Sequence, residues 1–184
     1  MRDKFTLRAL DEGYRARSVY KLIFLNKKYN LIKKNDNILD LGAWPGSWMQ
    51  FCLNLEARVT GVDVKQIISM KGGRFILGDI YDTKTLEKIR ELGKYDSVLS
   101  DLSPKTTGIN DQELSFDLSY KAFEIAKEVL RRNGSFVFKI FQSGYLNKFL
   151  QELKKSFNFV KSVKPEASKK GSKEMYIVCK DYKT

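Results

Sequence analysis

The chain has 184 residues, 42% of them hydrophobic, with 34 lysines and arginines against 22 aspartates and glutamates, for a formal net charge of +12. This length fits one well-packed domain, which we expect over 1–184 with a basic N-terminal arm at 1–16. The chain has no histidine, which excludes Ser-His-Asp and Cys-His nucleophilic catalysis and any histidine metal site. We predict no metal site. Cys52 and Cys179 lie in apolar stretches and are expected to be small buried side chains in a reducing cytoplasm.

Charge and hydropathy indicate the setting in which the protein works. A strongly basic protein suits a polyanionic partner, and nucleic acid is the commonest one. The alternative is that a lysine-rich composition yields a basic protein with no such ligand. The sequence contains no membrane-length apolar run, and its N-terminus is charged without an apolar signal segment. We therefore expect a cytoplasmic protein without a membrane partner.

Apolar periodicity predicts a regular alternation of helices and strands. The first helix covers 17–29, where apolar residues recur at helical spacing. Strands are predicted after it at 37–42, 58–64, 74–79, 95–101 and 134–141. Helices separate most of these strands, at 47–56, 83–92, 114–132 and 143–156. Two late strands, expected to pair antiparallel, close the chain at 158–164 and 174–181.

This order of elements predicts an α/β fold with one doubly wound, Rossmann-like sheet that is mostly parallel and has an antiparallel last strand. Ligands of such sheets bind beyond the carboxyl ends of the strands. Four aspartates fall at or near predicted strand ends: Asp40, Asp63, Asp79 and Asp101. These aspartates are the first candidates for ligand contacts.

The segment ILDLGAWPGSWMQF, residues 38–51, is typical of a buried strand that turns through glycines into a helix. Gly42 and Gly46 permit a tight turn and a close approach of the backbone to a ligand. Pro45 lies between them and donates no N–H, which makes the turn a poor pyrophosphate cradle. Neither the dinucleotide fingerprint nor the Walker A pattern is present. A ligand without a pyrophosphate is therefore favoured.

The aspartates that follow the turn point to a nucleoside. Asp63 ends the second strand, where a carboxylate can accept both ribose hydroxyls, and Asp79 could bind an adenine amino group. Each aspartate taken singly is better interpreted as a helix cap or turn residue, but their succession favours a nucleoside. S-adenosylmethionine fits better than NAD, because its amino-acid end needs one carboxylate and several backbone contacts. Asp40 and residues 42–48 can offer these.

Six motifs together resemble the FtsJ/RrmJ family of RNA ribose 2′-O-methyltransferases. They are DLGAWPGSW, GVDV, GDI, SDLSP, FVFKIFQ and SKEMYIV, and the likeness runs from residue 17 to the last strand. The resemblance implies a catalytic Lys-Asp-Lys-Glu set, here called the charged tetrad: Lys21, Asp101, Lys139 and Glu174. It also implies a group of S-adenosylmethionine contacts: Asp40, Gly42, Gly46, Trp48, Asp63, Asp79 and, next to the methyl group, Asp101. Ser47 and Trp44 depart from the family pattern, which leaves the detailed conformation of the turn open.

Each member of the charged tetrad also has a purely structural interpretation. Lys139 interrupts the apolar segment SFVFKIF, where a lysine is costly unless it is paired, but it could point from the strand end into solvent. Glu174 could lie on the surface beside Lys173, and Lys21 could extend along the helix into water. Asp101 could simply begin a turn. The functional interpretation requires that the four side chains converge.

The chemistry implied by the resemblance is demanding, because a ribose 2′-hydroxyl is a weak nucleophile that must lose its proton as it attacks a methyl carbon. Most of the catalysis should come from placing oxygen, carbon and sulfur in line. Lys139 could take the proton, and general-base help is typically worth ~10²–10⁴ in rate. A charged Lys139 could instead stabilise the developing alkoxide. The sequence does not separate these two roles.

Two basic segments could flank the site and contact phosphates. The predicted RNA contacts are Arg15, Arg17, Lys169, Lys170 and Lys173. The alternative for either segment is an ordinary solvated charged face.

By resemblance, small bacterial-type family members act on a uridine in the A-loop of large-subunit rRNA, and others methylate tRNA. We expect a monomer whose partner is rRNA within the large ribosomal subunit, with tRNA as the alternative substrate and no DNA. A non-catalytic RNA-binding protein on this scaffold is disfavoured by the complete charged tetrad. An NAD-dependent oxidoreductase is disfavoured by Pro45 and by the missing second glycine of the turn.

Overall fold

The structure of the chain is a computed structural model that describes residues 3–105, 108–168 and 171–184. The helices within these residues are α1 (Lys4–Asp11), α2 (Val19–Tyr29), α3 (Ser47–Asn54), α4 (Thr83–Glu91), α5 (Asp111–Val129) and α6 (Leu146–Ser156). The strands are β1 (Asn37–Leu41), β2 (Arg58–Asp63), β3 (Gly73–Leu77), β4 (Tyr95–Ser100), β5 (Leu130–Phe141), β6 (Phe157–Val163) and β7 (Glu174–Tyr182). No helix of the described chain is both long enough and apolar enough to cross a bilayer.

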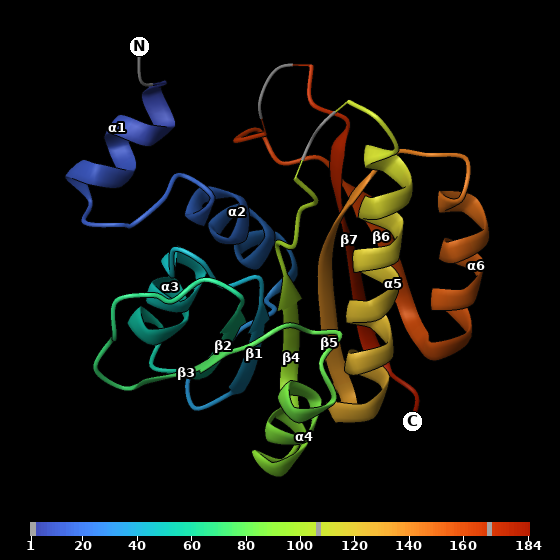
Figure 1. The fold of residues 1–184 in the computed structure, drawn as a ribbon, viewed down its shortest axis with the longest axis horizontal. Coiled ribbons are helices and arrows are strands. Elements are labelled where there is room, and N and C mark those ends of the chain that lie inside the picture. Colours follow the sequence, from blue (N-terminus) through green and yellow to red (C-terminus); the bar gives the residue numbers. More distant parts are fainter. Residues whose placement is uncertain (1–2, 106–107, 169–170) are drawn as a thin grey trace.

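One seven-stranded sheet joins all these strands in the order β3-β2-β1-β4-β5-β7-β6 (Figure 1). The strands from β3 to β5 are parallel, whereas β7 runs antiparallel to both β5 and β6. This topology confirms the predicted doubly wound α/β fold and its antiparallel closing pair. Because β7 is reversed, its first residue lies at the same edge of the sheet as the last residue of β5.

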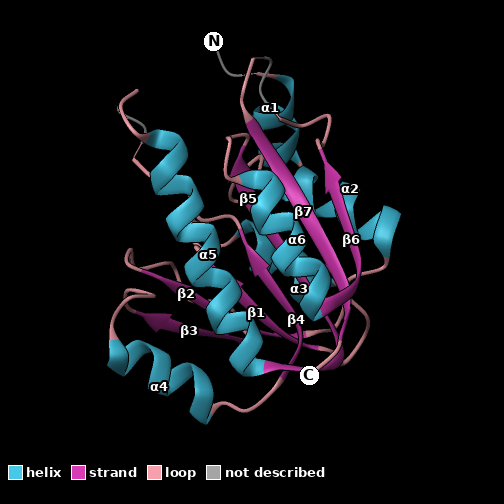
Figure 2. Ribbon diagram, turned by 90° about the vertical axis from the view of Figure 1, so that its right-hand side faces the viewer, coloured by secondary structure: helices cyan, strands magenta, loops and turns pink. Residues whose placement is uncertain are grey.

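Side chains that alternate along the strands pack into two apolar layers, one on each face of the sheet. Leu39 and Leu41 of β1 join a cluster with α4, α5 and α6, whereas Ile38 joins a cluster with α2 and α3. Figure 2 shows α5 and α6 in front of the sheet. Cys52 and Cys179 are buried and unpaired, as predicted. Polar groups gather instead at the end of the sheet where the parallel strands have their carboxyl ends, here called the carboxyl edge.

The largest error in the predicted boundaries lies between α5 and β5. The helix predicted over 114–132 ends at Val129, and β5 begins at Leu130. The β4–β5 register shifts beside Tyr95, and Asn133 has a φ of 63°, so a bulge hides the start of the strand from a period-two pattern. Helix α1 was not predicted at all. It begins after Asp3, whose carboxylate accepts hydrogen bonds from two backbone amides of the first turn.

The glycine turn (residues 42–48) links β1 to α3 and requires its glycines. Gly42 has a φ of 79° and Gly46 a φ of 107°, a region that disfavours side chains. A Cβ on Gly46 would also lie 2.8 Å from Nη1 of Arg15. The peptide between Trp44 and Pro45 is cis. The sequence expectation of a tight turn is therefore confirmed.

Gly61→Ala should destabilise the fold. Gly61 in β2 faces α3, and a Cβ there would lie 2.3 Å from Sδ of Met49 and 2.8 Å from Cβ of Ala43. Both neighbours are buried, so we expect a loss of ~1–3 kcal/mol from overpacking, measured by urea unfolding. Gly144→Ala is the matched control, since a Cβ there meets nothing within 4 Å. Equal unfolding midpoints for the two variants would contradict this packing.

Candidate active site

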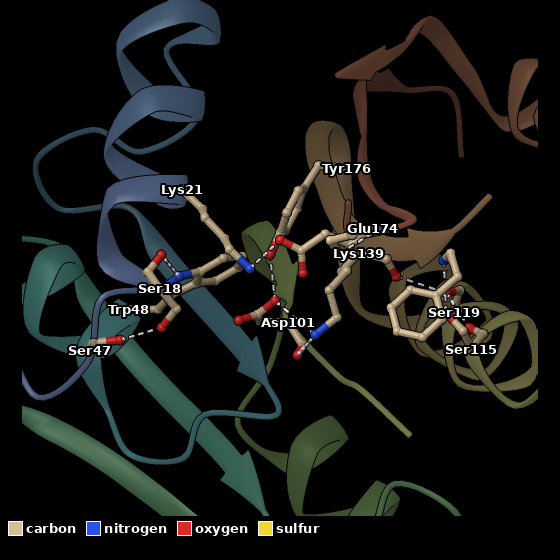
Figure 3. Close-up of polar contacts among 12 residues, drawn as sticks. Ser18, Lys21, Ser47, Trp48, Asp101, Ser115, Ser119, Lys139, Glu174 and Tyr176 are labelled. Carbon is tan, nitrogen blue, oxygen red and sulfur yellow. Dashed lines mark hydrogen bonds and ion pairs between the residues drawn. The ribbon is translucent and has the colours of Figure 1, made fainter. Parts of the chain in front are cut away.

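The charged tetrad gathers at the carboxyl edge of the sheet. Asp101 follows β4, Lys139 lies near the end of β5, and Glu174 opens β7. Lys21 reaches them from α2. The antiparallel register pairs Glu174 with Phe141, which places the start of β7 directly beside the end of β5. Figure 3 shows the four side chains pointing toward one another.

Lys139 and Asp101 form the inner ion pair. Nζ of Lys139 lies 3.1 Å from Oδ1 of Asp101 and donates a hydrogen bond of 2.8 Å to the backbone oxygen of the same residue. The Lys139 side chain is only 6% exposed. Its pairing satisfies the condition on which an ammonium can be buried in an apolar strand. Lys139 therefore does not point into solvent.

Lys21 and Glu174 form the outer ion pair. Nζ of Lys21 lies 2.7 Å from Oε1 of Glu174, and the two side chains are 12% and 13% exposed. Lys21 also lies above the ring of Tyr176, with 5.5 Å between Nζ and the ring centroid. Neither side chain therefore extends into solvent, as a purely structural role on the surface would require.

Tyr176 connects the two ion pairs. Its hydroxyl donates a hydrogen bond of 2.6 Å to Oδ1 of Asp101, the oxygen that also faces Lys139. Its ring packs against Trp48, with 6.0 Å between centroids. Sequence reasoning missed Tyr176, although its place two residues after Glu174 puts both side chains on one face of the strand.

Electrostatics fix the protonation of this centre. Burial raises the pKa of Asp101, but the nearby charges of Lys139 and Lys21, with the Tyr176 hydrogen bond, outweigh it and hold that pKa below its ordinary value. The carboxyl group is therefore ionised. Burial, together with Asp101 and Glu174, raises the pKa of Tyr176 well above its ordinary value, so its phenol stays a hydrogen-bond donor.

Two serines of α5 hold the end of β5. Pairing between β4 and β5 ends at Phe138, so the following backbone needs other partners. The hydroxyl of Ser119 donates to the carbonyl of Lys139 (2.9 Å), and the hydroxyl of Ser115 accepts from the N–H of Phe141 (2.9 Å). These buried serines are one helical turn apart, which is the only sequence signal that could have singled them out.

A second group of acids lies along the same edge, beyond β1, β2 and β3. The two oxygens of Asp63 accept the backbone N–H groups of Trp44 (2.9 Å) and Lys65 (2.8 Å). Oδ1 of Asp79 accepts the N–H of Tyr81 (3.0 Å). Both aspartates thus make the turn contacts of their structural interpretation. Because a carboxylate oxygen has more than one lone pair, these contacts leave capacity for a ligand.

Asp40 is buried, and the described residues offer its carboxyl group no hydrogen bond. Its side chain lies in β1, and neither carboxyl oxygen has a hydrogen-bond partner among the described residues. The residue is 1% exposed. Burial, with smaller contributions from Asp101 and Asp63, raises its pKa well above the ordinary value. A buried polar group of this kind requires an explanation outside the protein's own hydrogen bonds.

A family model described as FtsJ-like methyltransferase matches residues 14–182. The chain belongs to the FtsJ-like methyltransferase family. Curated relatives include proteins named ribosomal RNA large subunit methyltransferase E from Archaeoglobus fulgidus, 45% identical over 98% of this chain and 96% of the relative, and Treponema denticola, 43% identical over 98% and 95%. The fold resembles a crystal structure named as a ribosomal RNA methyltransferase from Plasmodium falciparum, with a TM-score of 0.81 and 31% identity over 92% of this chain and 98% of that one.

The FtsJ-like fold suits a methyl donor at the second group of acids. The positive-φ turn brings backbone groups close to Asp63, because the N–H of Trp44 binds its carboxylate. The unpartnered carboxyl of Asp40 lies on the neighbouring strand, opposite Gly61 in the β1–β2 register. A ligand with an ammonium group and vicinal hydroxyls fits these donors and acceptors.

The side chain of Trp48 is packed into the interior of this FtsJ-like methyltransferase. It is 3% exposed, and its Nε1 donates to the carbonyl of Ser18 (2.9 Å). Its contact with the donor stays a prediction. The two departures from the family pattern also differ in role, because the Ser47 hydroxyl lies 3.0 Å from that of Ser18, whereas Trp44 is exposed beneath Nζ of Lys65.

The basic residues predicted to bind RNA differ in their surroundings. Nη1 of Arg15 donates to the carbonyls of Pro45 (3.2 Å) and Ile68 (2.8 Å), so it braces the glycine turn. Arg17 donates to the carbonyl of Ala167 (2.5 Å) and forms an ion pair with Asp3, so it ties three segments together. Lys173 is exposed. Lys169 and Lys170 lie outside the described residues.

Asp40→Asn should stabilise the donor-free protein at neutral pH. Because the pKa of Asp40 is raised on folding, the folded state keeps a proton that the unfolded state loses above its ordinary pKa of ~3.9. The native group therefore costs stability as the pH rises through that value, by about 1.4 kcal/mol for each pH unit up to the raised pKa. Urea unfolding at pH 7 should show the gain, and it should shrink as the pH falls toward 4.

Asp79→Asn is the matched control, because this carboxyl is exposed and should give no such gain. A neutral-pH stability of Asp40→Asn below that of the wild type would show that the carboxyl has a protein partner after all.

Proposed function

We propose that this FtsJ-like methyltransferase transfers a methyl group from S-adenosylmethionine to a ribose 2′-hydroxyl of RNA, in the rRNA of the large ribosomal subunit. The observation that carries the proposal is the convergence of the buried Lys139 and the largely buried Lys21 on two carboxylates and the Tyr176 hydroxyl. The relatives named as large-subunit rRNA methyltransferases support the choice of substrate. We extend the proposal to a uridine in the A-loop, modified by a cytoplasmic monomer.

The donor would lie along the ends of β1, β2 and β3. When bound, S-adenosylmethionine would supply an electrophilic methyl group. Asp40 would face its ammonium group, Asp63 its ribose hydroxyls and Asp79 its adenine amino group. The glycine turn would contribute backbone contacts through Gly42 and Gly46. Asp101, between these acids and Lys139, would lie nearest to the methyl group.

Lys139 would act on the attacking hydroxyl. Its ammonium is held by two oxygens of Asp101, so its position is fixed before RNA arrives. An amine fixed there that has first lost its own proton to solvent can take a proton from the hydroxyl, whereas a fixed ammonium can stabilise the developing alkoxide. Lys21 and Glu174 would hold the ribose from the other side, since their ion pair is nearly buried at the same edge. Placement of the reacting atoms would then supply most of the rate.

Labelled-methyl transfer tests the proposed function. Purified protein would be incubated with labelled S-adenosylmethionine and, separately, with large ribosomal subunits, free rRNA and tRNA. We expect label in the large-subunit RNA, mapped to one ribose 2′-oxygen. Label that appears only in tRNA would show that tRNA, not rRNA, is the substrate. Label on a base would contradict the proposed ribose methylation.

Lys139→Ala should lower the single-turnover rate by at least ~10² while donor and RNA still bind. The paired carboxylate of Asp101 loses its main partner, so some loss of stability is also expected. Lys139→Arg separates the two roles, because arginine keeps the charge and cannot act as a base at neutral pH. Substantial activity in Lys139→Arg would assign Lys139 as an electrostatic stabiliser, whereas loss equal to that of Lys139→Ala supports the base.

Lys148→Ala, at an exposed lysine on α6, is the control for a general effect of charge. A Lys139→Ala variant with nearly wild-type rates would remove the charged tetrad from the chemistry.

A further inference from the structure

A cavity of about 410 Å³ lies beside the charged tetrad. Lys21 and Glu174 form part of its wall, so the cavity borders the outer ion pair directly. The remaining lining residues are Arg17, Ser18, Ser103, Phe141, Ala167 and Ser172. The volume falls near the lower end of the ~300–1,000 Å³ typical of small-ligand sites. The space therefore suits one nucleoside and excludes a nucleic-acid helix.

Phe141 gives this cavity an aromatic wall. It lies two residues after Lys139 in β5, so strand alternation places both side chains on one face of the sheet. Its backbone is held by the Ser115 hydroxyl (2.9 Å) and by pairing with Glu174. Phe141 is only partly buried, unlike the phenylalanines of the core. A fixed, accessible ring beside the lysine proposed to act on ribose is suited to stacking on a base.

The other walls carry hydroxyl groups. Ser18, Ser103 and Ser172 all line the cavity. The hydroxyl of Ser172 accepts the N–H of Glu174 (3.1 Å), which leaves its own proton available for donation. Hydroxyls that can both donate and accept match the edges of a nucleobase, which present both kinds of group.

The charge of the cavity favours a base over a phosphate. Among the described lining residues, Lys21 is paired with Glu174, and Arg17 is the one cation without a lining carboxylate opposite it. Arg17 itself pairs with Asp3 and donates to the carbonyl of Ala167. The described walls of the cavity therefore offer an aromatic face and neutral polar groups with little net charge, whereas phosphate sites concentrate arginine and lysine.

We propose that this cavity, the base pocket, receives the base of the nucleotide whose ribose is methylated, with Phe141 as its stacking surface. This inference rests on the proposed function. Because the base pocket holds a single nucleoside, the target nucleotide must leave its stack to enter it. Stacking on Phe141 would then place the attached ribose between Lys139 and the outer ion pair. The base itself thereby becomes part of what the enzyme recognises.

Removal of the ring or of the base tests this proposal. A synthetic RNA that contains the mapped ribose is made in two forms, one with its natural base and one abasic at that nucleotide with the 2′-hydroxyl retained. We expect Phe141→Ala to lower kcat/KM about ten-fold on the natural RNA, as for the loss of an aromatic–base stack. The wild type should lose a similar factor on the abasic RNA. Phe141→Ala should lose nothing further there, because the same contact is already gone.

Three controls accompany the comparison. Phe141→Tyr should keep most of the activity, because the stacking ring remains. Phe159→Ala, at a partly exposed ring on β6 that packs against Tyr29, should leave kcat/KM unchanged. The affinity of Phe141→Ala for S-adenosylmethionine, measured by calorimetry, should equal that of the wild type.

Two outcomes would overturn the base pocket while the proposed function stands: equal wild-type rates on the two RNAs, or an undiminished loss for Phe141→Ala on the abasic RNA. A methyl group mapped away from ribose would instead overturn the proposed function. In that case, the equilibrium affinities of the protein for the two RNAs test whether the base pocket binds a base, independently of the reaction. A preference for the natural RNA that Phe141→Ala removes supports it, and equal affinities for the two RNAs reject it.

Discussion

The buried carboxylate of Asp101 is the constraint around which the site is built. An ionised carboxyl at this depth is stable only if opposite charge and hydrogen-bond donors surround it, and Lys139 and Tyr176 both meet one of its oxygens. Lys21 adds a favourable charge from α2 and is itself balanced by Glu174. The charged tetrad thus sums to zero. Loss of any member would leave a charge poorly compensated, so these residues act as one unit in stability.

Topology explains why this unit can form. In a wholly parallel sheet the strand beside β5 would begin at the far edge, away from Asp101. The reversed β7 begins at the near edge instead, where Glu174 pairs with Phe141 and Tyr176 pairs with Lys139. Residues 139–141 at the end of β5 lie beyond its pairing with β4. There, Ser119 and Ser115 of α5 supply the hydrogen bonds that β4 does not. Just past the end of that pairing, Nζ of Lys139 donates to the backbone oxygen of Asp101.

The sequence predicted those parts of the site that depend on one element at a time. Asp63 follows from its position at the end of a strand, and Lys139 from the cost of a lysine in an apolar strand. Lys21 and Glu174 came only through the family resemblance, because an isolated charge on a helix or strand end looks like a surface residue. Tyr176 was missed because a tyrosine in an apolar strand resembles core, and its polar role depends on a partner two strands away. The segment 130–133 was misassigned because a bulge breaks the strand period.

The position of β7 also has a consequence for the order in which the site assembles. Residues 37–79 supply the strands and acids of the second group from one continuous stretch, so their contacts close short loops. The charged tetrad instead joins α2 near one end of the sequence to Glu174 near the other, which closes a much longer loop at a higher entropic cost. Pairing of β7 with both β5 and β6 offsets that cost. The charged tetrad is therefore complete only once β7 lies between β5 and β6.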